Sequence, residues 1–254
     1  MTAKQGIKLL GIFIVALLFA ACDSGSGTSS SGDIESSSSD CNTYGAGTVT
    51  DCRDGITYRT VAIGTQTWMA ENLKYVVDSS WCYDDAADNC TKYGRLYQWH
   101  TAMNLDSAYA SVSWGGSDVN HQGLCPEGWH LPNTDEWWTL HTYVEENNGN
   151  EGEGQSLKSI SGWGYSGTDL FGFTALPAGG RYYVSYYAPY FFYQWLESTG
   201  AFWTATEKSG DGRQANCRYM DDSSGGVGEN PMFDGFYLCT RLKIDGFSIR
   251  CVKN

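Results

Sequence analysis

Residues 125–138 read Cys-Pro-Glu-Gly-Trp-His-Leu-Pro-Asn-Thr-Asp-Glu-Trp-Trp, and we expect the rest of the chain to be organised around this stretch. Pro132 cannot continue a strand, and it biases Leu131 towards an extended conformation. Asn133 is a favourable N-cap, and the side chain of Glu136 can reach back to the amide of this cap residue. The stretch therefore predicts a strand end, a turn fixed by proline and a capped helix in succession.

The helix expected after this cap has one apolar face. Trp137, Leu140 and Val144 repeat at helical spacing, and Asn147-Asn148-Gly149 ends the run. Together with Trp129, which precedes the turn, Trp137 is interpreted as a core residue and not as a ligand contact.

The composition favours a loop-rich domain that buries many rings. Of 254 residues 15% are aromatic, Gly is abundant at 31 and Pro is scarce at 5. At this length the chain could hold one large domain or two small ones. The formal net charge of −13 disfavours contact with nucleic-acid phosphates, so we expect no nucleic-acid partner.

The first 22 residues have the pattern of a bacterial lipoprotein signal peptide. Two lysines precede the apolar run 9–20, and Phe19-Ala20-Ala21-Cys22 resembles a lipobox, in which the cysteine carries the lipid. Lipid on Cys22 leaves eight of the nine cysteines, an even number for a compartment in which disulfides form. The alternative is an ordinary secreted protein cleaved near Ala21. Residues 23–40 are rich in Ser and Gly and predict a flexible tether.

Short helices and strands follow without βαβ alternation, which predicts the α+β class. Residues 56–63 and 67–70 read as a β-hairpin with a turn at 64–66. Further strands are expected at 171–177, 201–206, 214–220, 236–242 and 246–252, and short helices at 100–106 and near 156–158. Local disulfides are expected to close two short loops, Cys41 with Cys52 and Cys82 with Cys90.

Several ordered blocks resemble the Fibrobacter succinogenes major paralogous domain. They comprise residues 54–55, 58–64, 68–73, 93–97, 125–132 with 136–137, 173–179, 202–207 and 248–253. The likeness runs from about Cys52 to the C-terminus, which favours a single domain over residues 41–254. Members of this family are typically secreted or lipid-anchored surface proteins with no settled biochemical activity. The resemblance therefore implies a location in the cell envelope.

One block, Leu131-Pro132 with Glu136-Trp137, is also similar to formylglycine-generating-enzyme-like proteins, which have the C-type lectin-like fold. The resemblance implies a C-type lectin-like α+β domain with short antiparallel strands, few helices and long loops, stapled by disulfides. It also implies a disulfide between Cys125, before the central helix, and Cys251 in the last strand. This is a likeness of fold and does not transfer activity.

The sequence carries no catalytic motif, and we expect no catalytic residue, no cofactor and no metal. The formylglycine-generating enzymes use a pair of nearby cysteines late in the domain, whereas Cys217 and Cys239 lie on predicted strands and favour a disulfide. The four histidines show no zinc-binding spacing, and His130 is interpreted as a packed, hydrogen-bonded side chain. The acidic, Gly-rich residues 221–230 fail the EF-hand pattern, which favours a solvated loop over a calcium site.

Residues 181–195 form the most unusual segment, with nine aromatic residues among fifteen. Tyr and Trp offer a large rigid contact area with a polar tip, which suits recognition surfaces and sugar faces. We expect this segment to face the ligand through Arg181, Tyr182, Tyr186, Tyr187, Tyr190, Tyr193 and Trp195. The alternative is a pair of aromatic strands that pack on the sheet.

These observations predict a lipid-anchored bacterial protein of the outer membrane or cell surface, attached to the membrane only through its lipid. Its predicted role is non-catalytic recognition or adhesion, with a polysaccharide or a cell-surface partner as the ligand. Two alternatives stay open: an enzyme derived from the formylglycine-generating fold, and a structural envelope protein without a ligand.

Overall fold

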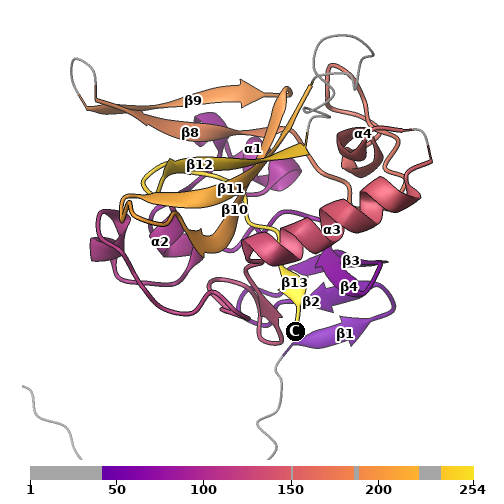
Figure 1. Cartoon of the computed structure of the whole chain (residues 1–254), viewed down its shortest axis with the longest axis horizontal. Coiled ribbons are helices and arrows are strands. Elements are labelled where there is room, and N and C mark those ends of the chain that lie inside the picture. The colour runs from indigo at the N-terminus through magenta and orange to yellow at the C-terminus, as the bar shows by residue number, and fades with distance from the viewer. Residues whose placement is uncertain (1–41, 150, 186–188, 223–235) are drawn as a thin grey trace, which may run out of the picture. The chain divides into compact units, whose positions relative to one another are not determined.

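Two sheets, assembled from different parts of the chain, organise the structure (Figure 1). It is a computed structural model that describes residues 42–149, 151–185, 189–222 and 236–254. The described chain is mostly sheet with few helices, and its strands are largely antiparallel.

The six-stranded sheet joins the first described strands to the C-terminal strand. Its order is β1 (Thr43–Gly45), β2 (Thr48–Thr50), β3 (Thr57–Ile63), β4 (Gln66–Met69), β13 (Val252–Lys253) and β7 (Trp129–His130). The hairpin predicted from the sequence is confirmed as β3 and β4. Val252 of β13 lies opposite Trp68 on one side and His130 on the other, so the chain end is built into the sheet.

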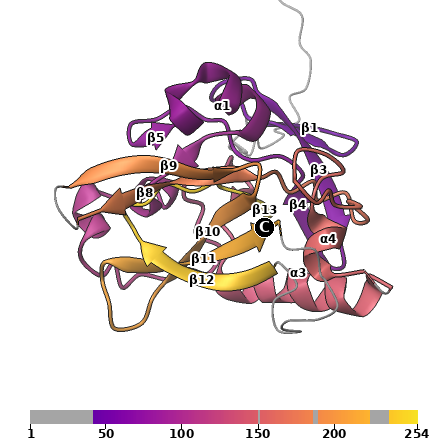
Figure 2. The same cartoon turned by 90° about the horizontal axis from the view of Figure 1, so that it is seen from above.

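The five-stranded sheet contains β12 (Phe236–Leu242), β11 (Gln214–Asp221), β10 (Thr199–Glu207), β8 (Ala178–Val184) and β9 (Tyr190–Leu196), in that order. The strands predicted at 201–206, 214–220 and 236–242 are thereby confirmed. Against the expectation of antiparallel strands, β8 and β10 pair in parallel, at Gly179 opposite Gly200. In both views the far end of the β8–β9 hairpin stands apart from β11 and β12 (Figures 1 and 2).

Short elements fill the connections. Between β4 and β7 lie β5 (Ser80–Trp81), the 3₁₀ helix η1 (Tyr83–Asp85), α1 (Ala87–Tyr93), β6 (Leu96–Tyr97), α2 (Trp99–Ala102) and the 3₁₀ helix η2 (Ser107–Ala110). The helix expected over 100–106 is therefore shorter than predicted, because α2 ends at Ala102. The short helical piece expected near 156–158 is α4 (Glu153–Leu157).

The predicted capped helix is α3 (Thr134–Asn147). Its capping box is complete, because Asn133 Oδ1 accepts from the Glu136 amide and Glu136 Oε2 accepts from the Asn133 amide, both at 2.9 Å. Glu136 Oε1 lies 2.6 Å from His130 Nε2, and His130 Nδ1 lies 2.6 Å from Asn254 Oδ1. His130 is thus packed and hydrogen-bonded, as predicted, and it joins α3 to the C-terminal residue.

The two tryptophans assigned to the core are buried, with exposed fractions of 1% for Trp129 and 0% for Trp137. Trp137 lies within a cluster of four further rings from both sheets and the loop before β8. Its ring centroid is 4.8 Å from Trp68, 5.6 Å from Phe202 and 6.0 Å from both Phe173 and Phe236. The apolar face of α3 therefore packs against both sheets.

Residues 171–177, predicted to form a strand, are irregular. The carbonyl oxygens of Phe173 and Thr174 accept hydrogen bonds from the buried guanidinium of Arg250, so they do not take part in a strand ladder. Thr174 also has a φ of 53°, which lies outside the strand conformation. The strand predicted at 246–252 is likewise wrong for most of its length, since only isolated bridges precede β13.

Three of the predicted disulfides are present, Cys82–Cys90, Cys125–Cys251 and Cys217–Cys239. The second joins residues 126 positions apart and fixes the segment before α3 to the segment before β13. The fourth predicted pair includes Cys41, which lies outside the described residues, as does Cys22. None of the helices in the described ranges is long and apolar enough to cross a membrane.

Candidate functional site

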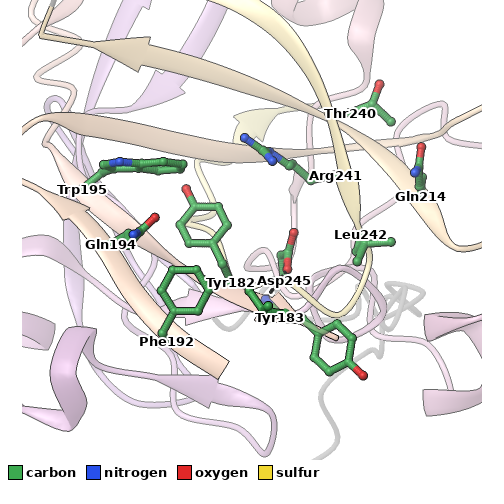
Figure 3. A pocket seen from close by; sticks show the side chains of 11 residues that line it. Tyr182, Tyr183, Phe192, Gln194, Trp195, Gln214, Thr240, Arg241, Leu242 and Asp245 are labelled. Atoms are coloured by element: carbon green, nitrogen blue, oxygen red, sulfur yellow. Dashed lines mark hydrogen bonds between the residues drawn. The ribbon is translucent and has the colours of Figure 1, made fainter. Parts of the chain in front are cut away.

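A hollow of about 290 Å³ lies between the β8–β9 hairpin and β12 (Figure 3). It forms because β8 pairs with β10 at Gly179, after which the hairpin departs from the sheet. Side chains of the hairpin line one side, and side chains of β12 and the turn after it line the other. Ligand sites are typically concave and mostly apolar, with a few convergent polar groups, and this hollow meets that description.

Four rings of the hairpin form a continuous row, here called the aromatic strip: Trp195, Tyr182, Phe192 and Tyr190. Neighbouring ring centroids in this order are 4.8, 6.0 and 5.7 Å apart. Tyr182 forms the floor with 5% of its surface exposed, whereas Trp195 and Tyr190 are 43% and 54% exposed. The first three rings line the hollow, and Tyr190 extends the strip over the open surface.

Trp195 belongs to the strip because the backbone breaks the alternation of the strand at this residue. In a regular strand Trp195 would share the face of Tyr193, away from Tyr182. Its φ of 64° reverses the side chain, and the indole packs edge-on against the Tyr182 ring. The opposite ladder position is Gly179, with a φ of 63°, where a Cβ would lie 2.5 Å from the carbonyl oxygen of Gln194. A bulky residue keeps a positive φ only where its surroundings enforce it, and such strain is typical of ligand clamps.

A chain of hydrogen bonds holds a cation against this floor. The hydroxyl groups of Tyr182 and Tyr219 lie 3.1 Å apart, and burial raises the pKa of both phenols, so both stay protonated. Nε of Arg241, on β12, donates to the Tyr219 hydroxyl at 3.0 Å. The Arg241 guanidinium lies 5.6 Å from the centroid of the Tyr182 ring, so the positive charge sits beside the aromatic strip.

Asp245 supplies the carboxylate of the hollow, and no other acidic residue is found among the described residues that line it. Only 4% of its surface is exposed, and Oδ1 accepts from the Tyr183 amide at 2.9 Å. Burial raises the pKa of Asp245 to about 6, although the Tyr183 amide and the charge of Arg241 act in the opposite direction. The amide of Gln194 completes a set of donors and acceptors beside the rings.

Two of the residues predicted to face the ligand lie on the other side of the hairpin. The guanidinium carbon of Arg181 lies 4.0 Å from the ring centroid of Trp81 and 3.8 Å from that of Phe191, so the cation is stacked between two rings. The Tyr193 hydroxyl donates to Asp85 Oδ1 at 2.7 Å. Arg181 and Tyr193 therefore anchor the hairpin to β5 and η1, and neither lines the hollow.

Of the remaining predicted site residues, Tyr182, Tyr190 and Trp195 come together in the aromatic strip. Tyr186 and Tyr187 lie outside the described residues, as does most of the acidic loop 221–230. Sequence reasoning missed Arg241 and Asp245, which lie far along the chain from the aromatic segment. In the sequence, Asp245 followed by Gly246 indicates a turn and does not indicate a binding role.

Potential metal ligands gather elsewhere. Among the described residues, one group of three side chains lies close enough together to bind a metal ion, namely His141, Glu145 and Glu153 on α3 and α4. None of these side chains lines the hollow.

Comparison with known proteins gives one match. The model of the family described as Fibrobacter succinogenes major domain matches residues 61–253, which includes every described residue of the hollow. No curated protein and no solved structure matches the chain.

Proposed function

This chain belongs to the Fibrobacter succinogenes major domain family, and on that premise we propose that it is a non-catalytic recognition protein of the bacterial cell envelope. Its ligand in this proposal is a polysaccharide, bound in the hollow between the β8–β9 hairpin and β12.

The aromatic strip beside Arg241 and Asp245 is the observation that carries the proposal. A sugar ring has apolar C–H faces that stack on aromatic side chains and hydroxyl groups that need hydrogen-bond partners. The exposed ring of Trp195 provides the stacking surface, while the carboxylate of Asp245 accepts from hydroxyl groups. Because Tyr190 extends the strip beyond the hollow, a chain of sugars fits better than a free monosaccharide.

The charge of the chain favours a neutral polysaccharide. The formal net charge is −13, so a polyanionic glycan would be repelled at long range. Within the hollow, Arg241 and Asp245 carry opposite charges and suit uncharged hydroxyl groups that can both donate and accept.

The residues that line the hollow favour binding of a glycan over its hydrolysis. Most glycoside hydrolases use a pair of carboxylates on either side of the scissile bond. Asp245 is the single carboxylate among the described lining residues. The alternative of an oxidase-like enzyme is also disfavoured, because Cys217 and Cys239 are joined to each other and Cys217 is fully buried.

The proposal includes a lipid anchor on Cys22 and a tether over residues 23–40 that holds the domain away from the membrane surface. Intact mass of protein extracted from membranes would then give a diacylated chain that begins at Cys22. We also propose that the fold is C-type lectin-like. The Cys125–Cys251 disulfide supports this, since that resemblance implied the pairing.

The test is retention of the full-length protein, in detergent, on immobilised neutral polysaccharides chosen from a glycan array. Trp195→Ala should weaken binding by about 30-fold, which corresponds to the ~2 kcal/mol of a binding hot spot. Tyr190→Ala, at the exposed end of the strip, should weaken it less. Trp138→Ala is the matched control, because Trp138 is 58% exposed on α3 and is not part of the hollow. Equal retention of the Trp195→Ala and Trp138→Ala variants would show that the hollow is not the site.

A further inference from the structure

We propose that α3 and α4 hold a divalent transition-metal ion, zinc by preference, between His141, Glu145 and Glu153. The potential ligand atoms of these three side chains lie within 4.8 Å of one another. His141 and Glu145 are four residues apart on α3 and therefore share one face of the helix. Glu153 is the first residue of α4, the short helix that lies beside α3 (Figure 1).

Two of the three ligands are already held in position. His141 Nδ1 lies 2.6 Å from Glu153 Oε2, and the two side chains are 16% and 12% exposed. The imidazole ring is fixed by Trp138, at 4.7 Å between centroids, and by Phe236 at 5.9 Å. His141 Nδ1 is buried and has no hydrogen-bond partner of good geometry among the described residues, so an ion inserted beside it would supply one.

Glu145 supplies the third ligand from the solvent side. Its carboxylate is exposed, so it can rotate towards the ion without disturbing the core. Tetrahedral zinc with bonds of ~2.0–2.2 Å needs ligand atoms roughly 3.4 Å apart, which a side-chain rotation can reach from the present separation. Three protein ligands would leave one position for water.

The local charge also favours a cation. Glu145 and Glu153 contribute two carboxylates, while the nearby Arg218 is 3% exposed and offsets one of them. Burial lowers the pKa of Arg218 to about 10 and Glu153 opposes this shift, so the guanidinium stays charged at neutral pH. The two carboxylates therefore outnumber the one guanidinium near them.

The ligand set selects the class of metal. Imidazole suits zinc and its neighbours in the first transition row, whereas calcium and magnesium prefer sites made entirely of oxygen. Bound zinc would fasten α4 to α3 across the connection between residues 147 and 153. The ion would therefore act as a structural clamp, independently of the glycan hollow.

The experiment measures thermal unfolding of the full-length protein after treatment with a chelator, with added zinc chloride or calcium chloride. Zinc at a hundredfold excess over its dissociation constant should raise the Tm by about 5–10 °C, and calcium should not. Cobalt(II) in place of zinc should give the visible absorption of a tetrahedral site. The proposal is overturned if zinc leaves the Tm unchanged.

Variants separate this site from adventitious binding. Glu145→Gln changes an exposed side chain and should fold normally, yet it should weaken zinc binding by about tenfold or more, since even second-shell changes have that effect. His141→Gln should abolish the zinc-dependent shift. His121→Gln is the matched control, because His121 hydrogen-bonds to the Met103 carbonyl oxygen and is not part of the cluster. A zinc shift that persists in both His141→Gln and Glu145→Gln would refute the assignment.

Discussion

Replacement of Asp245 by Asn should stabilise the protein at neutral pH. Asp245 is 4% exposed, and burial raises its pKa from 3.8 to about 6, with the Tyr183 amide and Arg241 acting against this shift. Ionisation is therefore harder in the folded chain than in the unfolded one. The amide oxygen of Asn can still accept from the Tyr183 amide, so the substitution removes the buried charge and keeps the hydrogen bond.

The magnitude and sign follow from proton linkage. Between pH 3.8 and about 6 the folded chain keeps this proton while the unfolded chain releases it, so the free energy of unfolding falls as the pH rises through this window. A shift of roughly two pKa units corresponds to ~3 kcal/mol. We expect Asp245→Asn to raise the free energy of unfolding by up to that amount at pH 7.5, and to be nearly neutral at pH 4.

The assay is denaturant unfolding of both proteins at several pH values, with disulfides intact. Asp211→Asn serves as a control of opposite sign, because the Arg213 amide and side chain lower the pKa of this carboxyl. The ionised carboxylate of Asp211 therefore stabilises the folded chain at neutral pH, and this stabilisation is lost as the pH falls. The reasoning would be refuted if Asp245→Asn were less stable than the parent at pH 7.5. It would also be refuted if the difference in the free energy of unfolding between the two proteins were the same at every pH. If the stabilised variant also binds glycan less well, the buried charge is retained for function.

Two further substitutions test the packing. Trp137→Ala should lower the free energy of unfolding by ~3–5 kcal/mol through the cavity it leaves. Trp137→Phe should lower it far less, since the indole N–H has no hydrogen-bond partner among the described residues. Thermal unfolding compares the two variants, and an equal loss of stability in both would contradict the explanation. Gly179→Ala should weaken glycan retention as well as stability, because the new Cβ meets the Gln194 carbonyl oxygen. Gly210→Ala, at another positive φ but with open space around it, should lower stability only through the strain of its left-handed backbone and should leave binding unchanged.

Much of the fold is predictable because its signals are local. The capping box of Asn133 and Glu136 and the apolar spacing of α3 are contained within a few residues. The hairpin of β3 and β4 is marked by a glycine turn. The three described disulfides follow from cysteine spacing and, for Cys125–Cys251, from the family resemblance.

The irregular segment 171–177 was not predictable, because its conformation depends on a residue at the other end of the chain. Arg250 is fully buried and needs acceptors for its guanidinium, which it finds in Asn72 and in carbonyl oxygens that include those of Phe173 and Thr174. Local alternation of apolar residues favours a strand, but leaving a buried charge without acceptors would be more unfavourable than losing a few ladder hydrogen bonds. The pairing of Arg250 with this segment cannot be read from either stretch alone.

The aromatic strip shows how the same limit applies to the placement of a single side chain. The composition of residues 181–195 indicates a recognition surface, yet alternation alone assigns Trp195 to the face of Tyr193, where it would pack towards η1. The left-handed conformations of Trp195 and of the opposite Gly179 overturn that assignment and bring the indole onto Tyr182. Gly179 is the only trace of this inversion in the sequence, and a glycine in a strand has several other uses. The strained backbone at Trp195 packs the indole on Tyr182 yet leaves the ring 43% exposed, and the proposed contact with a ligand is the physical reason we see for keeping this strain.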